Sequence, residues 1–196
     1  MSSLFFNLFL CKIMSMKKAI ILLLIGIFFL TLDFVLQKKD VLTNVKGGKM
    51  KITSVFEHNG YIPSIYTCDG QDLAPELAIS GVPEGAKELV LIVDDPDAPM
   101  GTWVHWLVYN LPANSSAIDA KKLPQEAKQG ITDFGRVGWG GPCPPGGTHR
   151  YFFKLYALDK NLDLEQGLTK LQLEKAIKES VIEKAELIGL YKRIKS

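Results

Sequence analysis

Two carboxylates at the end of a predicted strand are the first residues whose types and spacing could do chemistry. Asp95 and Asp97 follow the apolar run Leu89–Val93 and are interrupted by Pro96, with Pro99 close behind. Proline fixes φ and has no N–H for a β-ladder, so we expect both carboxylates on a stiff loop. Most such runs are acidic surface turns. The alternative hypothesis is a rigid platform that directs carboxylates into a pocket.

His105 is the next candidate, on the predicted strand 103–110. Strict alternation would place His105, Leu107 and Tyr109 on one face of this strand. A histidine among such neighbours is more often a hydrogen-bonded core residue than a ligand. The strand alone therefore does not decide between a structural and a functional role.

His149 is the stronger histidine candidate. It follows Gly146 and Gly147, whose backbone N–H groups can approach an anion closely. In the strand that follows, alternation places His149 and Tyr151 on one face and Arg150 on the other. An imidazole and a phenol are thus predicted to point the same way beside a flexible, glycine-rich loop.

The elements that must position these residues are mostly strands. Alternating or apolar runs predict seven or eight of them, and an amphipathic helix is predicted to start at the capping box of Thr169 and Gln172. The fold class is therefore mainly β, a sandwich of antiparallel sheets with a C-terminal helix and an N-terminal hydrophobic helix. Further predicted segments are strands at 50–56, 65–70, 73–79 and 186–194, the last with Gly189 as a bulge, and a helix stripe of Leu171, Leu173, Ile177, Val181 and Ile182.

The first residues of the chain are expected to stand apart from the folded domain. Lys17 and Lys18 precede an apolar run with no small-residue cleavage site after it. This pattern favours an uncleaved signal anchor over 1–36, a linker over 37–49 and a domain over 50–196 outside the cytoplasmic membrane. A cleaved, secreted or periplasmic form is the alternative, and a buried core helix is a weaker one.

Charge argues against a nucleic-acid partner. The net charge is +2, but residues 1–49 hold seven Lys and two Asp, which leaves −3 for residues 50–196. A mildly acidic domain lacks the basic surface that binding to a phosphate backbone requires. A nucleic-acid ligand is not expected.

Three motifs in order resemble the phosphatidylethanolamine-binding protein family, in particular its bacterial and archaeal Raf-kinase-inhibitor-like branch. They are Asp95-Pro-Asp-Ala-Pro99, Trp103-Val-His105 and Gly141-Pro-Cys-Pro-Pro-Gly-Gly-Thr-His-Arg-Tyr151. The resemblance covers about 52–193 and implies a β-sandwich with a small anion pocket at one end. It implies as pocket residues Asp95, His105, His149 and Tyr151, with the Gly141–Pro142 backbone at the rim. We add Asp97, from the same loop as Asp95, to the predicted ligand-binding set.

The chemistry of these residues suits a phosphate-bearing ligand, such as a phospholipid head group. Imidazole and phenol groups donate hydrogen bonds to phosphate oxygens. Asp95 is expected to orient a histidine or contact an ammonium group, and to raise the histidine pKa. The sequence therefore predicts non-enzymatic binding without a cofactor, at a surface that could also inhibit a kinase or protease.

An enzyme remains the alternative. A hydrolase of phospholipids or esters would need an activated nucleophile, and Cys143 near His149 is the one candidate pair. Asp95, Asp97, His105 and His149 lack the spacing of a dedicated metal site. Turnover of an ester substrate would distinguish the enzyme from a binding protein.

Cysteine usage leaves two interpretations open. Cys68 and Cys143 lie in separate predicted loops, and Cys11 lies in the leader. In an exported domain the two loop cysteines are candidates for a disulfide. Two unpaired, buried thiols are the alternative.

Overall fold

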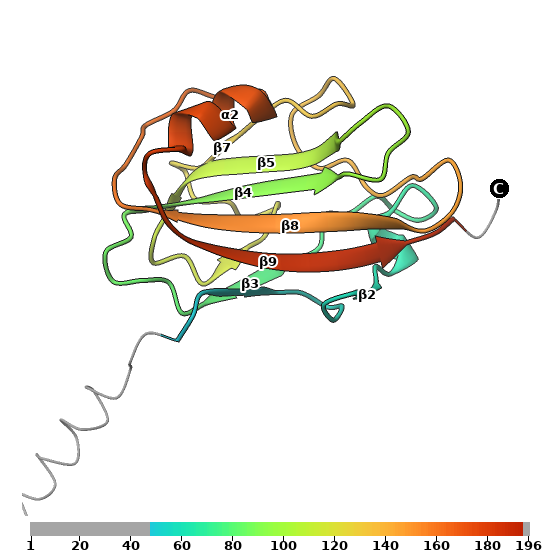
Figure 1. The fold of residues 1–196 in the computed structure, drawn as a ribbon, viewed down its shortest axis with the longest axis horizontal. Coiled ribbons are helices and arrows are strands. Elements are labelled where there is room, and N and C mark those ends of the chain that lie inside the picture. The colour runs from blue at the N-terminus through green and yellow to red at the C-terminus, as the bar shows by residue number, and fades with distance from the viewer. Residues whose placement is uncertain (1–47, 194–196) are drawn as a thin grey trace, which may run out of the picture. The chain divides into compact units, whose positions relative to one another are not determined.

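Strand β4 (Glu88–Asp95) lies inside a six-stranded sheet, and all eight of its residues are buried. The computed structural model describes residues 48–193. The sheet has the order β2-β9-β8-β4-β5-β7, with β4 paired antiparallel to both β5 (Trp103–Pro112) and β8 (His149–Leu158) (Figure 1). The prediction that the apolar run before Asp95 is buried on both faces is confirmed.

A second, three-stranded sheet covers one face of the first. Its order is β1-β3-β6, all antiparallel, with β1 at Lys51–Thr53, β3 at Leu77–Ser80 and β6 at Ala117–Ile118. The remaining strands of the large sheet are β2 (Gly60–Tyr61), β7 (Lys128–Gln129) and β9 (Val181–Tyr191). We predicted antiparallel sheets, but β2 pairs with β9 in parallel, so the large sheet is mixed. The mainly β fold with one C-terminal helix is nevertheless the predicted one.

Two apolar layers result from the alternation of side chains along the strands. On β4, Leu91 and Val93 face the small sheet, where they pack with Trp106 and Phe153. Val90 and Ile92 point the other way and pack beneath helix α2 (Lys170–Ile177). Each such buried side chain contributes roughly 1.5–3 kcal/mol relative to exposure, so β4 is a main source of stability.

Helix α2 begins at the predicted capping box. The Thr169 side chain accepts from the Gln172 N–H, and the Gln172 side chain accepts from the Thr169 N–H at 2.8 Å. Leu173 and Ile177 are buried against the sheet, as predicted. Leu171 is 77% exposed, and Val181 belongs to β9, so the apolar stripe is narrower than the sequence indicated.

Two other predictions were wrong. Residues 65–70 do not form a strand: Ser64–Tyr66 is a 3₁₀ helix, η1, followed by a turn in which the Gly70 N–H donates to the Thr67 carbonyl. Strand β9 begins earlier than predicted, and Gly189 pairs in register with Tyr151 rather than forming a bulge. Glycine is needed there because a Cβ atom would collide with Ile62, which packs across it.

Beside the polar end of the sheet, a β-bulge lies in β5 and not at Gly189 of β9. Val93 of β4 pairs with Trp106, but the next residue, Asp94, pairs with Val104, so His105 has no partner on β4. The extra residue reverses the alternation, and His105 therefore does not share a face with Leu107 and Tyr109 as predicted. Those two side chains pack beneath α2, whereas His105 contacts aromatic rings on the opposite side of the sheet.

The predicted N-terminal hydrophobic helix and the 1–36 leader lie outside the described residues, as does most of the 37–49 linker. Within 48–193, no helix has the length and apolar character that a membrane span requires.

Candidate functional site

Polar residues replace apolar ones where the inner faces of β4 and β8 reach one end of the sandwich. On β4 the alternation continues from Val93 to Asp95. On β8 it runs from Phe153 back to Tyr151 and His149, all of which are buried. Because β4 and β8 are antiparallel, the end of one meets the start of the other, and the three polar side chains converge.

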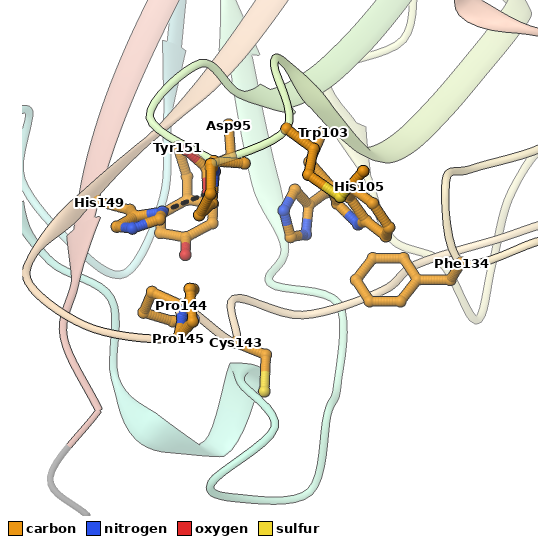
Figure 2. Close-up of a pocket in the computed structure, with 12 residues that line it drawn as sticks. Asp95, Trp103, His105, Phe134, Cys143, Pro144, Pro145, His149 and Tyr151 are labelled. Carbon is orange, nitrogen blue, oxygen red and sulfur yellow. Dashed lines mark hydrogen bonds and ion pairs between the residues drawn. The ribbon is translucent and has the colours of Figure 1, made fainter. Parts of the chain in front are cut away.

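Asp95 and His149 form a buried pair at this end. The His149 Nδ1 atom lies 2.7 Å from Asp95 Oδ2, and the two residues are 7% and 3% exposed (Figure 2). A carboxylate accepts, so Nδ1 of the ring carries the proton and donates it. This contact leaves Nε2 of His149, which has no hydrogen-bond partner among residues 48–193, for a ligand.

The bulge in β5 brings His105 to the same place. Its Nδ1 donates to the Gly140 carbonyl at 2.5 Å, and the Gly140 N–H donates back to the His105 carbonyl at 2.9 Å. Its ring lies edge-on to Tyr151 and Phe134, with centroids 5.1 and 5.3 Å away. Burial lowers the pKa of His105 and outweighs Gly140 and Asp95, so the predicted rise in histidine pKa is wrong for this residue.

The depressed pKa of His105 predicts acid sensitivity of the fold. Unfolded chains protonate histidine near pH 6.5, whereas folded His105 resists protonation, so stability should fall as the pH drops below about 6.5. The slope for one proton is at most about 1.4 kcal/mol per pH unit. Urea unfolding at pH 7.5 and 5.5 measures it, and the His105→Gln variant should lose this part of the dependence. An equal pH dependence in that variant would contradict the assignment.

Tyr151 contributes a hydroxyl without a partner. The residue is 1% exposed, and its Oη atom forms no hydrogen bond with any residue of 48–193. Burial first, and then the charge of Asp95, raise the pKa of Tyr151. The hydroxyl therefore keeps its proton and can donate it to a ligand. Figure 2 shows it directed towards Pro144, across the cavity from the strands.

These four residues lie at the floor of a cavity of about 480 Å³. This volume is within the range of about 300–1,000 Å³ that is usual for small-molecule sites. The rest of the lining is apolar or uncharged: Ala98, Pro99, Met100, Trp103, Phe134, Cys143, Pro144 and Pro145. Met100 is 93% exposed and Phe134 is 39% exposed, so the cavity has an apolar rim.

Asp97 does not line the cavity, although it was predicted to bind the ligand. Its carboxylate accepts from the Arg150 backbone N–H at 3.0 Å and from the Arg150 guanidinium at 2.6 and 2.8 Å. Its own N–H donates to Asp95 Oδ1 at 2.8 Å. The Arg150 guanidinium holds the pKa of Asp97 at about 2, so the pair persists at any pH above the acid range. Asp97 and Arg150 thus form an ion pair beside the Asp95–His149 pair.

The Asp97–Arg150 ion pair is expected to position Asp95 and His149 rather than to contact a ligand. Arg150→Gln should weaken ligand binding only a few-fold, because Arg150 is exposed and surface ion pairs contribute little. Arg150→Lys keeps the charge but not the two-pronged geometry, so it should behave like Arg150→Gln. Isothermal titration calorimetry with a phosphate-bearing ligand, the class expected from the sequence, measures both. A loss as large as that of a direct ligand contact would place Arg150 in the site.

Gly141 and Pro142 lie behind the cavity wall rather than in its lining. The Gly141 N–H donates to Asp72 Oδ1 at 2.7 Å, and the Pro142 carbonyl accepts from the Cys68 N–H at 3.1 Å. A Cβ atom at Gly141 would collide with the side chain of Asp72 and the backbone at Tyr66. These residues therefore hold the wall in place and do not line the cavity.

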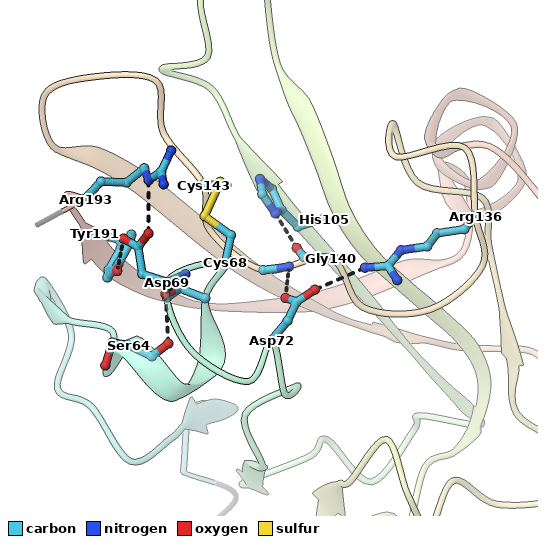
Figure 3. Close-up of a disulfide and its surroundings, with 12 residues drawn as sticks. Ser64, Cys68, Asp69, Asp72, His105, Arg136, Gly140, Cys143, Tyr191 and Arg193 are labelled. Atoms are coloured by element: carbon cyan, nitrogen blue, oxygen red, sulfur yellow. Dashed lines mark hydrogen bonds and ion pairs between the residues drawn. A yellow bond between two sulfur atoms is a disulfide. The ribbon is translucent and has the colours of Figure 1, made fainter. Parts of the chain in front are cut away.

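Cys68 and Cys143 are joined by a disulfide, with Cα atoms 5.4 Å apart (Figure 3). The bond connects the turn after η1 with the loop that forms the cavity wall. Within 48–193, no three His, Cys, Asp or Glu side chains are close enough together to hold a metal ion.

The rim residues were not identified as site residues from the sequence. Met100, Phe134, Pro144 and Pro145 come from three loops, and no local pattern indicates that their side chains converge. The positive φ of Gly101, which follows Met100, is the one local sign of a tight turn that projects a side chain.

Comparison with known proteins gives consistent matches over the described domain. A family model described as phosphatidylethanolamine-binding protein matches residues 52–192. A UPF0098 protein of Methanothermobacter thermautotrophicus is 50% identical over 146 residues, which are 72% of this chain and 97% of the relative. A UPF0098 protein of Pyrococcus horikoshii is 46% identical over 154 residues, which are 74% and 77% of the two chains.

Two solved structures share the fold. One is a phosphatidylethanolamine-binding protein homologue of Chlamydia trachomatis, with a TM-score of 0.70 and 43% identity over 74% of this chain and 98% of that one. The other is Escherichia coli YbcL, described as a new member of the mammalian family, with a TM-score of 0.70 and 32% identity over 74% and 99%.

Proposed function

The chain belongs to the phosphatidylethanolamine-binding protein family, which supports a general ligand-binding role, and on this premise we propose that it binds a small phosphate-bearing ligand in the cavity without turning it over. The ligand class is a phosphate monoester or a phospholipid head group. The phosphate would lie at the floor of the cavity, between His149 and Tyr151.

One observation carries the proposal: two atoms on the floor of the cavity, Tyr151 Oη and His149 Nε2, have no hydrogen-bond partner among residues 48–193. The Tyr151 hydroxyl is buried and unpaired among the described residues. A buried hydroxyl without a partner costs about 1–3 kcal/mol, so its burial is best explained by a ligand or water that accepts from it. His149 is oriented by Asp95 through Nδ1, which leaves Nε2 for a ligand on the same cavity floor.

The floor also offers acceptors for a cation. His105 donates through Nδ1 to Gly140, so its neutral ring has only a lone pair left at Nε2. The second carboxylate oxygen of Asp95, Oδ1, accepts one hydrogen bond, from the backbone N–H of Asp97. A carboxylate oxygen can accept more than one, so Oδ1 can also accept from an ammonium group. Phosphoethanolamine carries both a phosphate and an ammonium group, so this mixed set of donors and acceptors suits it.

The contacts argue against a hydrolase at this cavity. Asp95 and His149 resemble the orienting residue and base of a nucleophilic site, but such a site needs a Ser, Thr or Cys within about 3 Å of the base. The cavity lining includes no Ser or Thr, and Cys143 is bonded to Cys68. The raised pKa of Tyr151 makes its phenol a poor nucleophile. Binding without chemistry therefore has the better support.

Titration of the full-length protein with phosphoethanolamine and with inorganic phosphate tests the proposal. Calorimetry should show one site for each ligand, and phosphoethanolamine should remain intact after prolonged incubation. Absence of binding to both ligands, or release of phosphate or ethanolamine, would contradict it. Inhibition of a kinase or protease and an extracytoplasmic location stay predictions from the sequence.

A further inference from the structure

The Cys68–Cys143 disulfide is placed where it can control the cavity. Cys143 lines the cavity, and Cys68 lies on the neighbouring turn. Both cysteines are exposed residues, which favours access of a thiol from solvent. Exposed disulfides are typically the more easily reduced ones, and they are often regulatory.

Hydrogen bonds hold the cavity wall on the N-terminal side of Cys143, at residues 140–142, but not on its C-terminal side. Gly140 is hydrogen-bonded to His105 (Figure 3), Gly141 to Asp72, and Pro142 to the backbone of Cys68. From 143 to 147 the described structure contains no hydrogen bond at all. Pro144 and Pro145 have no N–H to offer.

Within the described chain, the disulfide is therefore the only covalent or hydrogen-bonded cross-link of residues 143–147. This segment supplies three members of the cavity lining, namely Cys143, Pro144 and Pro145. The strands beneath it do not depend on the bond, because β4 lies between β5 and β8 and is paired with β5 from Glu88 to Asp95 and with β8 from Glu88 to Asp94. Loss of the bond would loosen the wall and leave the sheet intact.

We propose that the Cys68–Cys143 disulfide is a thiol–disulfide exchange site that holds the cavity wall in its binding conformation, and that its reduction weakens ligand binding. The reductant is a dithiol. One of its thiolates attacks Cys68 or Cys143, forms a mixed disulfide and releases the other cysteine as a thiolate, which takes up a proton. The second thiol of the reductant then displaces the first cysteine. Two electrons and two protons reach the protein, and the reductant leaves as a disulfide.

The size of the effect depends on how often the released wall adopts the binding conformation. If it does so about one-tenth of the time, the apparent Kd rises about tenfold. Linkage requires the reverse effect too: saturating ligand should make the bond about tenfold harder to reduce. For a two-electron couple this corresponds to a potential about 30 mV lower. The effect on binding rests on the proposed function, whereas release of the wall does not.

Hydrogen–deuterium exchange and calorimetry on the same samples test the inference. Full-length protein is compared before and after treatment with dithiothreitol, with phosphoethanolamine as the probe. Reduction should speed exchange of the Cys68 and Gly141 amides, whose hydrogen bonds to Pro142 and Asp72 hold the adjoining wall, leave β4, β5 and β8 protected, and raise the Kd about tenfold. The Cys68→Ser/Cys143→Ser variant should match the reduced protein and should not respond to dithiothreitol, which controls for effects of the reagent elsewhere.

Unchanged exchange of the Cys68 and Gly141 amides after reduction would overturn the inference, as would an equal Kd in the two redox states. Loss of protection throughout the large sheet would also overturn it, because the bond would then hold the fold rather than the wall. If phosphoethanolamine binds neither state, the proposed function fails, and the release of the wall is then decided by exchange alone.

Discussion

His149→Ala is expected to weaken phosphoethanolamine binding roughly ten- to a hundredfold. Hydrogen bonds to charged groups contribute about 1.5–3 kcal/mol, and each 1.4 kcal/mol is a tenfold change in Kd. His149 is the residue that Asp95 orients towards the cavity, so its removal deletes a ligand contact and leaves Asp95 Oδ2 without its hydrogen bond. Calorimetry on folded variants measures the change. His58→Ala, in a turn outside the cavity lining, is the matched control and should bind like the unmodified protein.

Asp95→Asn distinguishes the two roles assigned to the carboxylate. If Asp95 acts only by orienting His149, the double variant Asp95→Asn/His149→Ala should bind no worse than His149→Ala alone. If Asp95 also contacts the ammonium group, Asp95→Asn should weaken phosphoethanolamine binding more than binding of inorganic phosphate. Wild-type affinity in both the Asp95 and His149 variants would place the ligand elsewhere.

Removal of the disulfide is expected to have the largest effect on stability. The bond closes a loop with a sequence separation of 75 residues, for which the chain-entropy model gives about 4 kcal/mol. For a domain of this size, that loss corresponds to a decrease in Tm of about 10 °C. Urea unfolding of the Cys68→Ser/Cys143→Ser variant, followed by tryptophan fluorescence, measures it.

Thiol counting provides the independent check on the bond. Alkylation of the denatured, non-reduced protein should modify one of the three cysteines, Cys11, and reduction should expose the other two. Modification of all three without reduction would contradict the disulfide. A variant as stable as the unmodified protein would contradict the estimate of its contribution.

Much of the site floor could be predicted from the sequence because it lies on regular strands, where the pattern of apolar and polar residues shows which side chains are buried. The apolar run before Asp95 has no polar interruption, which predicted burial on both faces of β4. The same alternation correctly predicted His149 and Tyr151 on the inner face of β8, with Arg150 outside. These predictions succeeded because neither strand has a bulge near the site.

The errors occurred where that alternation breaks down or where loops meet. No Gly or Pro marks the bulge at His105, so nothing local indicated that its side chain changes face. Asp97 shares a loop with Asp95, but its side chain meets Arg150 outside the cavity. The rim at Met100 and Phe134 depends on how separate loops pack, which a single sequence does not encode locally.

A crystal structure of the protein with phosphoethanolamine is the most direct test of the central claim. The account predicts phosphate oxygens within hydrogen-bonding distance, about 2.5–3.2 Å, of both His149 Nε2 and Tyr151 Oη, with the ammonium group towards Asp95 or His105. Ligand bound at another surface, or an empty cavity at saturating ligand, would contradict the account.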